Sequence, residues 1–218
     1  MDINAYIFDM DGVLCDSEPL IAEAACRMFK ETYGVSVVPA DFAPFVGTGE
    51  DRYLGGVAQK AGVTIQLPRD KDVTYHLYAQ AVPGRLQPVP GVIDFIRNAR
   101  ASGIKLAVAT SADAFKMRVN LEALGLDPAH FSALVTGEDI EHKKPAPDIF
   151  LAAAAKMAVP PARCVVFEDA VNGVQAARAA GMRCVGLTTF FDAADLTAAG
   201  ADATWPDFNQ AQPGAFAC

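Results

Sequence analysis

The sequence lacks the features that would tie the chain to a membrane, an oxidising compartment or a nucleic acid. It has no uninterrupted apolar run of about 18 residues, which a membrane-spanning helix needs. Its 5 cysteines are an odd number and form no CxxC pair, which argues against a disulfide framework and a zinc site. Lys and Arg number 18 against 26 Asp and Glu, and the net charge of -8 would repel a phosphate backbone. We therefore expect reduced thiols, no membrane contact and no nucleic-acid partner.

The chain does contain enough apolar material for a sizeable core. Of its 218 residues, 52% are hydrophobic and 20% are charged, which is typical of one large folded domain or two small ones. The N-terminus begins almost at once with a strand-like run and shows no secretory signal pattern, although a processed chain would look the same. The cytoplasm is therefore the expected compartment.

From residue 88 onward, helical and strand-like patterns alternate along the chain. Apolar runs that predict buried strands lie at 106–109, 133–135, 164–167 and 184–187, with a weaker one at 203–205. The helical patterns between them lie near 92–101, 113–123, 147–157 and 171–180. This alternation predicts an α/β fold with a Rossmann-like parallel sheet that is covered by helices on both faces.

A helical segment interrupts this alternation near the N-terminus. The first strand is predicted at 5–8, and the other strands follow only after residue 88. The segment between them is mostly helical, with helices from about Ser17, over 50–61 and over 69–81, and a break at Leu67-Pro68. We expect a core domain of residues 1–16 and 88–218, and an inserted small α-helical cap domain of residues 17–87. The segment 208–218, rich in Gln, Pro, Gly and Ala, is expected to be loose.

Polar side chains follow four of the predicted strands, at the edge where parallel sheets bind their ligands. In chain order they are Asp9 and Asp11, Thr110 and Ser111, Lys144, and Glu168 and Asp169. Taken singly, each group has a plainer explanation as a surface turn, a helix N-cap or a solvated lysine. Together they place acids, hydroxyls and a lysine at one edge of a sheet. That combination favours a site for a divalent cation and a phosphoryl group.

These residues and their order resemble the four motifs of the haloacid-dehalogenase (HAD) superfamily. The sequence reads DMDGV at 9–13, TS at 110–111, KP at 144–145 and ED at 168–169. The stretches 144–150 and 167–174 are similar to the branch of β-phosphoglucomutases and phosphoglycolate phosphatases, in which a small helical cap follows the first motif. The stretches 45–50 and 54–58 resemble the HAD domain of chloroplast suppressor-of-quenching proteins. If the chain is a processed or excised domain of that kind, the expected compartment is the chloroplast.

The resemblance implies phosphoryl transfer through an aspartyl-phosphate. Asp9 would be the nucleophile, and Asp11 would protonate the leaving oxygen and then take a proton from the attacking water. Mg²⁺ would bind Asp9, the backbone carbonyl of Asp11 and Asp169, while Glu168 would hold a metal-bound water. The phosphoryl oxygens would be held by Thr110, the N–H of Ser111 and Lys144. Haloacid dehalogenases need no acid at the position of Asp11, so dehalogenation itself is not expected.

The resemblance does not distinguish between a phosphatase and a mutase. Sugar-phosphate mutases of this branch carry a His and an Arg in the cap, at positions that correspond to Ile21 and Glu50. An acidic Glu50 would repel the second phosphate of a mutase intermediate, although Arg52 lies nearby. We therefore expect a phosphatase for a small phosphorylated metabolite such as a sugar phosphate, with β-phosphoglucomutase-type activity as the alternative. The cap residues expected to select the substrate are Glu18, Thr48, Gly49, Glu50 and Arg52.

Three expectations concern the chain as a whole and its cysteine near the first motif. A regulatory or partner-binding HAD domain without enzymatic activity is the alternative to an enzyme, although the complete set of motif residues argues against it. A monomer is the expected state. Cys15, four residues after Asp11, is expected to be a small apolar residue, with an oxidation-sensitive thiol as the alternative.

Overall fold

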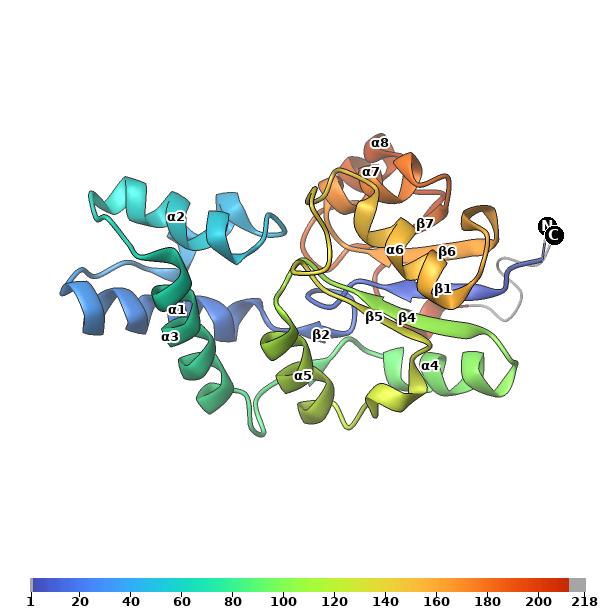
Figure 1. The fold of residues 1–218 in the computed structure, drawn as a ribbon, viewed down its shortest axis with the longest axis horizontal. Helices are drawn as coiled ribbons and strands as arrows, with labels where there is room; N and C mark the ends of the chain where they lie inside the picture. The colour runs from blue at the N-terminus through green and yellow to red at the C-terminus, as the bar shows by residue number, and fades with distance from the viewer. Residues whose placement is uncertain (1, 212–218) are drawn as a thin grey trace.

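The computed structural model describes residues 2–211, and its centre is a sheet of six parallel strands (Figure 1). The strand order is β5-β4-β1-β6-β7-β8. The strands are β1 Ala5–Phe8, β4 Lys105–Ala109, β5 Ala133–Val135, β6 Cys164–Glu168, β7 Arg183–Leu187 and β8 Ala203–Trp205. The predicted α/β fold with a Rossmann-like parallel sheet is therefore confirmed.

Helices cover both faces of this sheet, which explains why its strands are apolar on both sides. In Figure 1, α4 and α5 lie below the sheet, and α6, α7 and α8 lie above it. These helices are α4 Val92–Ala101, α5 Ala114–Ala123, α6 Asp148–Met157, α7 Val171–Ala179 and α8 Ala193–Ala199. Successive side chains of β1 enter different apolar clusters, because Phe8 packs in one and Ile7 in the other.

An aromatic cluster closes the lower face of the sheet and involves a residue that we expected to be loose. The rings of Phe8 and Phe167 stack at 5.0 Å, and Phe208 lies 5.3 Å from Phe167. Phe208 is only 3% exposed and begins the 3-10 helix Phe208–Gln210. The expectation of a loose segment is therefore wrong for residues 208–210, since one buried ring is enough to anchor a polar stretch. The rest of that expectation, at 212–218, lies outside the described residues.

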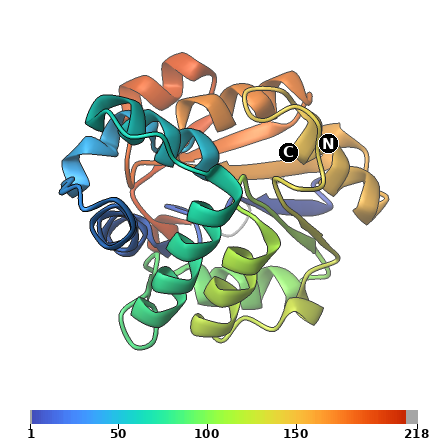
Figure 2. The ribbon, with the colours of Figure 1, turned by 60° about the vertical axis from the view of Figure 1, so that its left-hand side comes forward.

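Three helices form a separate group beyond the carboxyl ends of the strands, and Figure 2 shows them from another side. They are α1 Glu18–Tyr33, α2 Glu50–Ala61 and α3 Leu67–Ala81. Short 3-10 helices at Pro39–Asp41 and Ala43–Phe45 join α1 to α2. The predicted break at Leu67-Pro68 is wrong, because both residues belong to the first turn of α3. A proline is tolerated there since the N–H that it lacks would have no partner within the helix.

A short ribbon that was not predicted joins this group of helices, hereafter called the helical insert, to the sheet. The strands β2 Cys15–Asp16 and β3 Gln87–Pro88 pair in antiparallel fashion, so the chain enters and leaves the insert at one place. The boundaries that we propose from the sequence, after residue 16 and before residue 88, lie at this ribbon.

Helix α8 was also missed by the sequence reading. The side chain of Asp192 accepts a hydrogen bond from the N–H of Asp195 at its start, and Gly200 ends it in a left-handed conformation. Of the helices between residues 2 and 211, none has the length and apolar character that crossing a membrane requires.

Candidate functional site

The strand order brings the motif residues to one place. Because β1 lies between β4 and β6, Asp9 has Thr110 on one side and Glu168 on the other. The backbone N–H of Asp9 donates to the carbonyl of Phe167, which continues the pairing of β1 with β6 one residue further. A cavity of about 400 Å³ opens at this edge of the sheet, beneath the helical insert. Its lining includes Asp9, Asp11, Thr110, Ser111, Lys144, Glu168 and Asp169.

Lys144 provides a fixed positive charge beside Asp9. Its Nζ lies 2.7 Å from Oδ1 of Asp9 and also donates to Oε1 of Glu168, while its side chain is only 4% exposed. Burial by itself lowers the pKa of Lys144, but Asp9 and Glu168 raise it above its usual value, so the lysine stays charged. The other oxygen of Glu168 accepts the N–H of Ala170. Glu168 therefore holds Lys144 in position.

The buried carboxylates around Lys144 outnumber it. The pKa of Asp9 is raised to about 7, mainly by burial and also by Glu168 and Asp11, because Lys144 offsets these effects only in part. Burial and the neighbouring Glu168 and Asp9 raise the pKa of Asp169 well above its usual value. A site with this much uncompensated acidity favours a bound cation, since a cation would stabilise the ionised carboxylates.

The donor set fits Mg²⁺, although the side chains alone do not form a complete ligand set. Among the described residues, no group of three or more His, Cys, Asp or Glu side chains is arranged to hold a metal ion. Asp11 and Glu168 are bound by lysines, and Lys144 also binds Oδ1 of Asp9, which leaves Oδ2 of Asp9 and the carboxylate of Asp169. Two carboxylates and a backbone carbonyl suit Mg²⁺, because this ion keeps several waters and takes few protein ligands. Gly12 makes room for Asp169, since a Cβ at Gly12 would overlap the Asp169 carboxylate.

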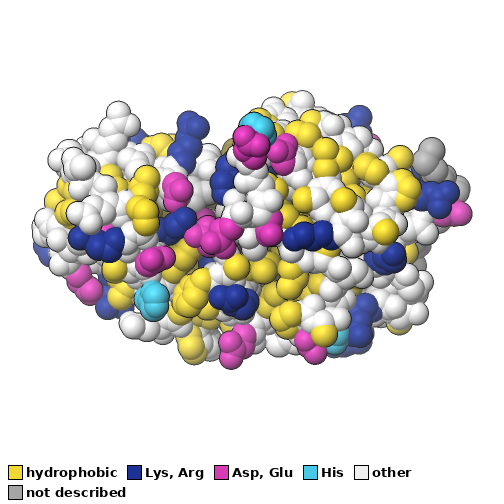
Figure 3. Space-filling model, in the orientation of Figure 1, with side chains coloured by type: hydrophobic (Ala, Val, Ile, Leu, Met, Phe, Trp, Pro, Cys, Tyr) yellow, Lys and Arg dark blue, Asp and Glu magenta, His cyan; other side chains and the backbone are white. Residues whose placement is uncertain are grey.

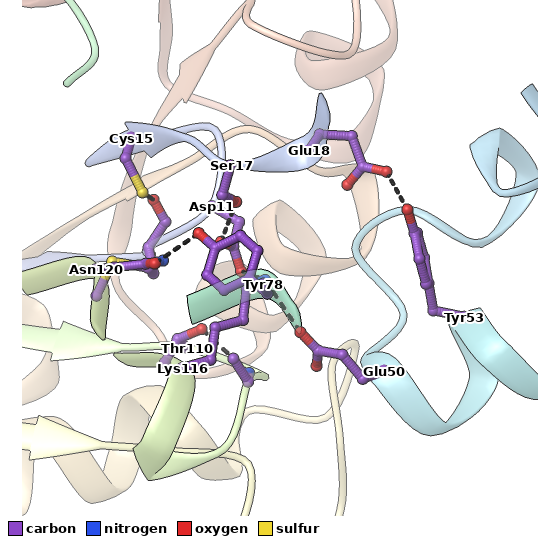
Figure 4. Close-up of polar contacts among 12 residues, drawn as sticks. Asp11, Cys15, Ser17, Glu18, Glu50, Tyr53, Tyr78, Thr110, Lys116 and Asn120 are labelled. Carbon is purple, nitrogen blue, oxygen red and sulfur yellow. Dashed lines mark hydrogen bonds and ion pairs between the residues drawn. The ribbon is translucent and has the colours of Figure 1, made fainter. Parts of the chain in front are cut away.

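Asp11 is held by two partners, neither of which was predicted from the sequence to contact it. Its Oδ1 accepts the hydroxyl of Ser17, and its Oδ2 accepts Nζ of Lys116 at 2.9 Å (Figure 4). Lys116 comes from the first turn of α5. A lysine there opposes the helix dipole, and this unfavourable placement is the sequence signal that could have identified it.

The residues expected to select the substrate divide into two groups. Glu18, Gly49 and Glu50 line the cavity, but Thr48 and Arg52 are not among the described residues that do so. The hydroxyl of Thr48 donates to the carbonyl of Phe45, and Arg52 is exposed. The expectation that these two residues face the substrate is therefore not supported.

Glu18 has an aromatic partner that the sequence reading missed. Its Oε1 accepts the hydroxyl of Tyr53 at 2.6 Å, and burial raises its pKa to about 7 (Figure 4). Figure 3 shows acidic and basic side chains close together where the helical insert meets the rest of the molecule. The insert therefore adds acidic groups to the cavity, and the core adds Lys116 and Lys144.

Cys15 lies near the site but is sealed off from it. Its side chain is 0% exposed, and its Sγ contacts the carbonyl of Met10 at 3.8 Å. Burial, together with the nearby Asp11, raises the pKa of the thiol well above its usual value. A buried and protonated thiol reacts slowly with oxidants, so the structure favours the apolar role for Cys15.

Comparisons with known proteins extend over most of the chain. It is 45% identical over 201 residues to the protein SUPPRESSOR OF QUENCHING 1, chloroplastic, of Arabidopsis thaliana, a match that covers 91% of this chain. The chain spans only 19% of the length of that protein. It is also 33% identical over 180 residues to the phosphorylated carbohydrates phosphatase of Thermotoga maritima, covering 83% of this chain and 82% of that one.

A solved structure matches the fold over nearly its full length. The crystal structure of CbbY from Rhodobacter sphaeroides, in complex with xylulose-1,5-bisphosphate, has a TM-score of 0.86 and 28% identity. The match covers 95% of this chain and 96% of that one. The family model described as haloacid dehalogenase-like hydrolase matches residues 3–181, a range that includes β1, the helical insert and the residues around Asp9. The chain therefore belongs to the haloacid dehalogenase-like hydrolases.

Proposed function

We propose that the chain is a Mg²⁺-dependent phosphatase that hydrolyses a small phosphate monoester, such as a sugar phosphate, through an aspartyl-phosphate. The observation that carries the proposal is the position of Asp9. This carboxylate lies at the end of the central strand, at the bottom of a cavity, with a buried lysine 2.7 Å away. A nucleophile and a fixed cation in one cavity are what phosphoryl transfer to a protein carboxylate requires.

In the first proposed step, a carboxylate oxygen of Asp9 forms a bond to phosphorus while the bond from phosphorus to the ester oxygen breaks. The electron pair of that bond stays on the ester oxygen, which takes a proton from Asp11 and leaves as an alcohol. Thr110, the N–H of Ser111 and Lys144 hold the phosphoryl oxygens, because they line the cavity around Asp9.

In the second proposed step, a water oxygen attacks phosphorus and the phosphoryl group leaves Asp9. Asp11 now takes a proton from that water, which restores the acid form used in the first step. The products are inorganic phosphate and the free carboxylate of Asp9. Because Asp11 serves in both steps, its orientation matters twice in each turnover.

Asp9, Asp169 and the backbone carbonyl of Asp11 would hold the metal ion, with Glu168 near a metal-bound water. Bound Mg²⁺ supplies positive charge that stabilises the phosphoryl oxygens and lowers the repulsion between them and Asp9. Lys144 contributes charge of the same kind through its contacts with Asp9 and Glu168.

The lining of the cavity favours a singly phosphorylated substrate, whereas the relatives support phosphorylated carbohydrates in general, since the matched CbbY structure holds xylulose-1,5-bisphosphate. The matched Thermotoga protein is named as a phosphatase of phosphorylated carbohydrates. The insert lines the cavity with Glu18 and Glu50 rather than with bases, so a second phosphate would meet carboxylates. This favours a phosphatase over a β-phosphoglucomutase-type enzyme, which has to hold a bisphosphate.

A regulatory role inside a longer protein is the second candidate. The match to SUPPRESSOR OF QUENCHING 1 favours it, since this chain corresponds to about one fifth of that protein. For an independent chain we propose a cytoplasmic monomer, and for a domain of such a protein we propose the chloroplast.

The first test measures phosphate release. Wild type should release inorganic phosphate from p-nitrophenyl phosphate and from a panel of sugar phosphates when MgCl₂ is present. Asp9→Asn should be inactive, and Asp94→Asn should be fully active because Asp94 lies on the exposed face of α4. Equal inactivity of wild type and Asp9→Asn across the panel would overturn the enzymatic proposal and favour the regulatory one.

A further inference from the structure

Lys116 is a buried cation that joins the sheet domain to the helical insert. Its side chain is only 3% exposed, and it comes from α5, beside the sheet. Its Nζ donates to Oδ2 of Asp11 at 2.9 Å and to Oε1 of Glu50 at 3.0 Å. Glu50 begins α2 in the insert, so one ammonium group links the motif acid to the insert (Figure 4).

The surroundings of Lys116 keep it charged. Burial by itself lowers the pKa of this lysine, but Asp11 and Glu50 raise it well above its usual value. The ring of Tyr78, from α3 of the insert, lies 5.6 Å from Nζ, which adds a favourable cation–π contact. An ammonium in this position is costly to desolvate; Asp11 of the core compensates part of that cost, and Glu50 and Tyr78 add to it when the insert is in place.

The two oxygens of Asp11 are held separately. Ser17, directly before α1, donates its hydroxyl to Oδ1, while Lys116 donates to Oδ2. A carboxyl group fixed at Oδ2 by an ammonium can carry a transferable proton only on Oδ1. The hydroxyl of Ser17 can rotate, so it can accept from a protonated Oδ1 as well as donate to an ionised one.

We propose that Lys116 is a positioning residue that orients Asp11 for proton transfer when Glu50 of the insert contacts it. The inference rests on the proposed function, because it concerns the acid of that reaction. The proton on Oδ1 of Asp11 moves to the ester oxygen as the bond from phosphorus to that oxygen breaks, and Lys116 keeps its own protons throughout. Closure of the insert thereby fixes the orientation of the Asp11 carboxyl group that proton transfer needs. The substrate is not cleaved efficiently while the insert is open.

The test uses two substrates that differ in their need for an acid. Nitrophenolate leaves readily without a proton, whereas the more basic phenolate depends on one, and the two phosphate esters have similar shapes. For Lys116→Met, the ratio of kcat/KM for p-nitrophenyl phosphate to that for phenyl phosphate should rise by about tenfold or more, because acid catalysis contributes on the order of 10²–10⁴-fold. Asp11→Asn gives the upper limit of this rise, and Glu50→Gln should raise the ratio less than Lys116→Met does.

Lys71→Met is the matched control. Lys71 also joins the insert to the core, since its Nζ lies 2.8 Å from Asp113 and 3.1 Å from Asp51, but it does not contact Asp11. Its loss should leave the substrate ratio unchanged. A wild-type ratio in Lys116→Met would overturn the proposal, even if both activities fell, since a purely structural lysine would affect both esters equally.

A second variant covers the case in which Lys116→Met fails to fold. Lys116→Met combined with Glu50→Gln removes the ammonium together with the carboxylate of the insert, and Asp11, which is part-exposed and keeps its bond from Ser17, is the charge of this cluster that remains. If this double variant shows wild-type circular dichroism and a raised ratio, the proposal stands; a wild-type ratio overturns it. If wild type hydrolyses neither ester, it is the proposed function that fails.

Discussion

Gly12 and Asp169 lie so close together that any side chain at Gly12 would occupy the space of the Asp169 carboxylate. Gly12 also has a φ of 75°, a left-handed conformation that other residues adopt at a cost. Two separate requirements therefore meet at one glycine in the loop after β1. One concerns the backbone, and the other concerns the position of a proposed metal ligand.

Gly12→Ala should therefore lose activity for a reason beyond backbone strain. The left-handed conformation costs about 1–2 kcal/mol for alanine, and displacement of Asp169 should lower kcat/KM on the order of 100-fold. Gly34→Ala is the matched control, because Gly34 has a φ of 70° but open space around its Cβ position. Steady-state kinetics on p-nitrophenyl phosphate and thermal melts check both variants. Equal activity of the two variants would argue against a role for Asp169.

Asp169→Asn should affect the metal-free and the metal-loaded protein in opposite directions. Without metal, the substitution removes a buried carboxylate that lies near Asp9 and Glu168, so stability should rise on the order of 1 kcal/mol. With MgCl₂, wild type should gain melting temperature while the variant gains little, because binding to the folded state stabilises it. Differential scanning fluorimetry with and without EDTA measures both effects. An equal MgCl₂ shift in the two proteins would exclude Asp169 as a ligand.

Glu18 should make the protein less stable as the pH rises. Its pKa is about 7 in the folded protein, against an ordinary value of 4.5, so the folded state binds this proton more tightly than the unfolded state. The stabilising effect is complete below about pH 4.5 and is lost as the pH rises to about 7. The free energy of unfolding of Glu18→Gln relative to that of wild type should therefore increase by up to about 3 kcal/mol as the pH rises from about 5 to about 8. Urea unfolding at both pH values measures this difference, and a pH-independent difference would contradict the assignment.

Sugar monophosphates should be better substrates than the corresponding bisphosphates. Glu18 and Glu50 line the side of the cavity that belongs to the insert, and they would repel a second phosphate. We expect kcat/KM for glucose 1-phosphate to exceed that for glucose 1,6-bisphosphate by about tenfold or more, since a close like-charge contact costs more than about 1.4 kcal/mol. Glu50→Gln should narrow this difference. Formation of glucose 6-phosphate from glucose 1-phosphate in the presence of the bisphosphate would instead show a mutase.

The residues around Asp9 could be predicted because their positions follow from the sheet alone. Each motif residue comes within a short distance of a strand that the apolar pattern reveals, and parallel strands end at a common edge. Lys116 could not be identified in this way, since its importance depends on Glu50, which approaches from a different part of the chain. The sequence pattern shows where a strand ends, but it does not show which helix packs against that end.

The substrate-facing residues were predicted with less success because of helix geometry. Glu50 and Tyr53 are three residues apart, so they share a face of α2, and that face points into the cavity. Arg52 lies on another face and is exposed. The sequence located the correct turn, but the rotation of α2 about its axis depends on packing of the insert, which the sequence pattern alone does not determine.

The ribbon of β2 and β3 has a consequence for how proteins of this shape diversify. Because Cys15–Asp16 pairs with Gln87–Pro88, the long segment between them begins and ends at adjacent points of the backbone. Such a segment is connected to the sheet in the same way as an enlarged loop. Doubling the length of a loop adds only about 0.6 kcal/mol to the free-energy cost of closing it. A different segment could therefore be exchanged at this junction without shifting Asp9, Lys144 or Asp169. New selectivity can in this way evolve by replacement of one continuous stretch of the gene while the chemistry is inherited unchanged.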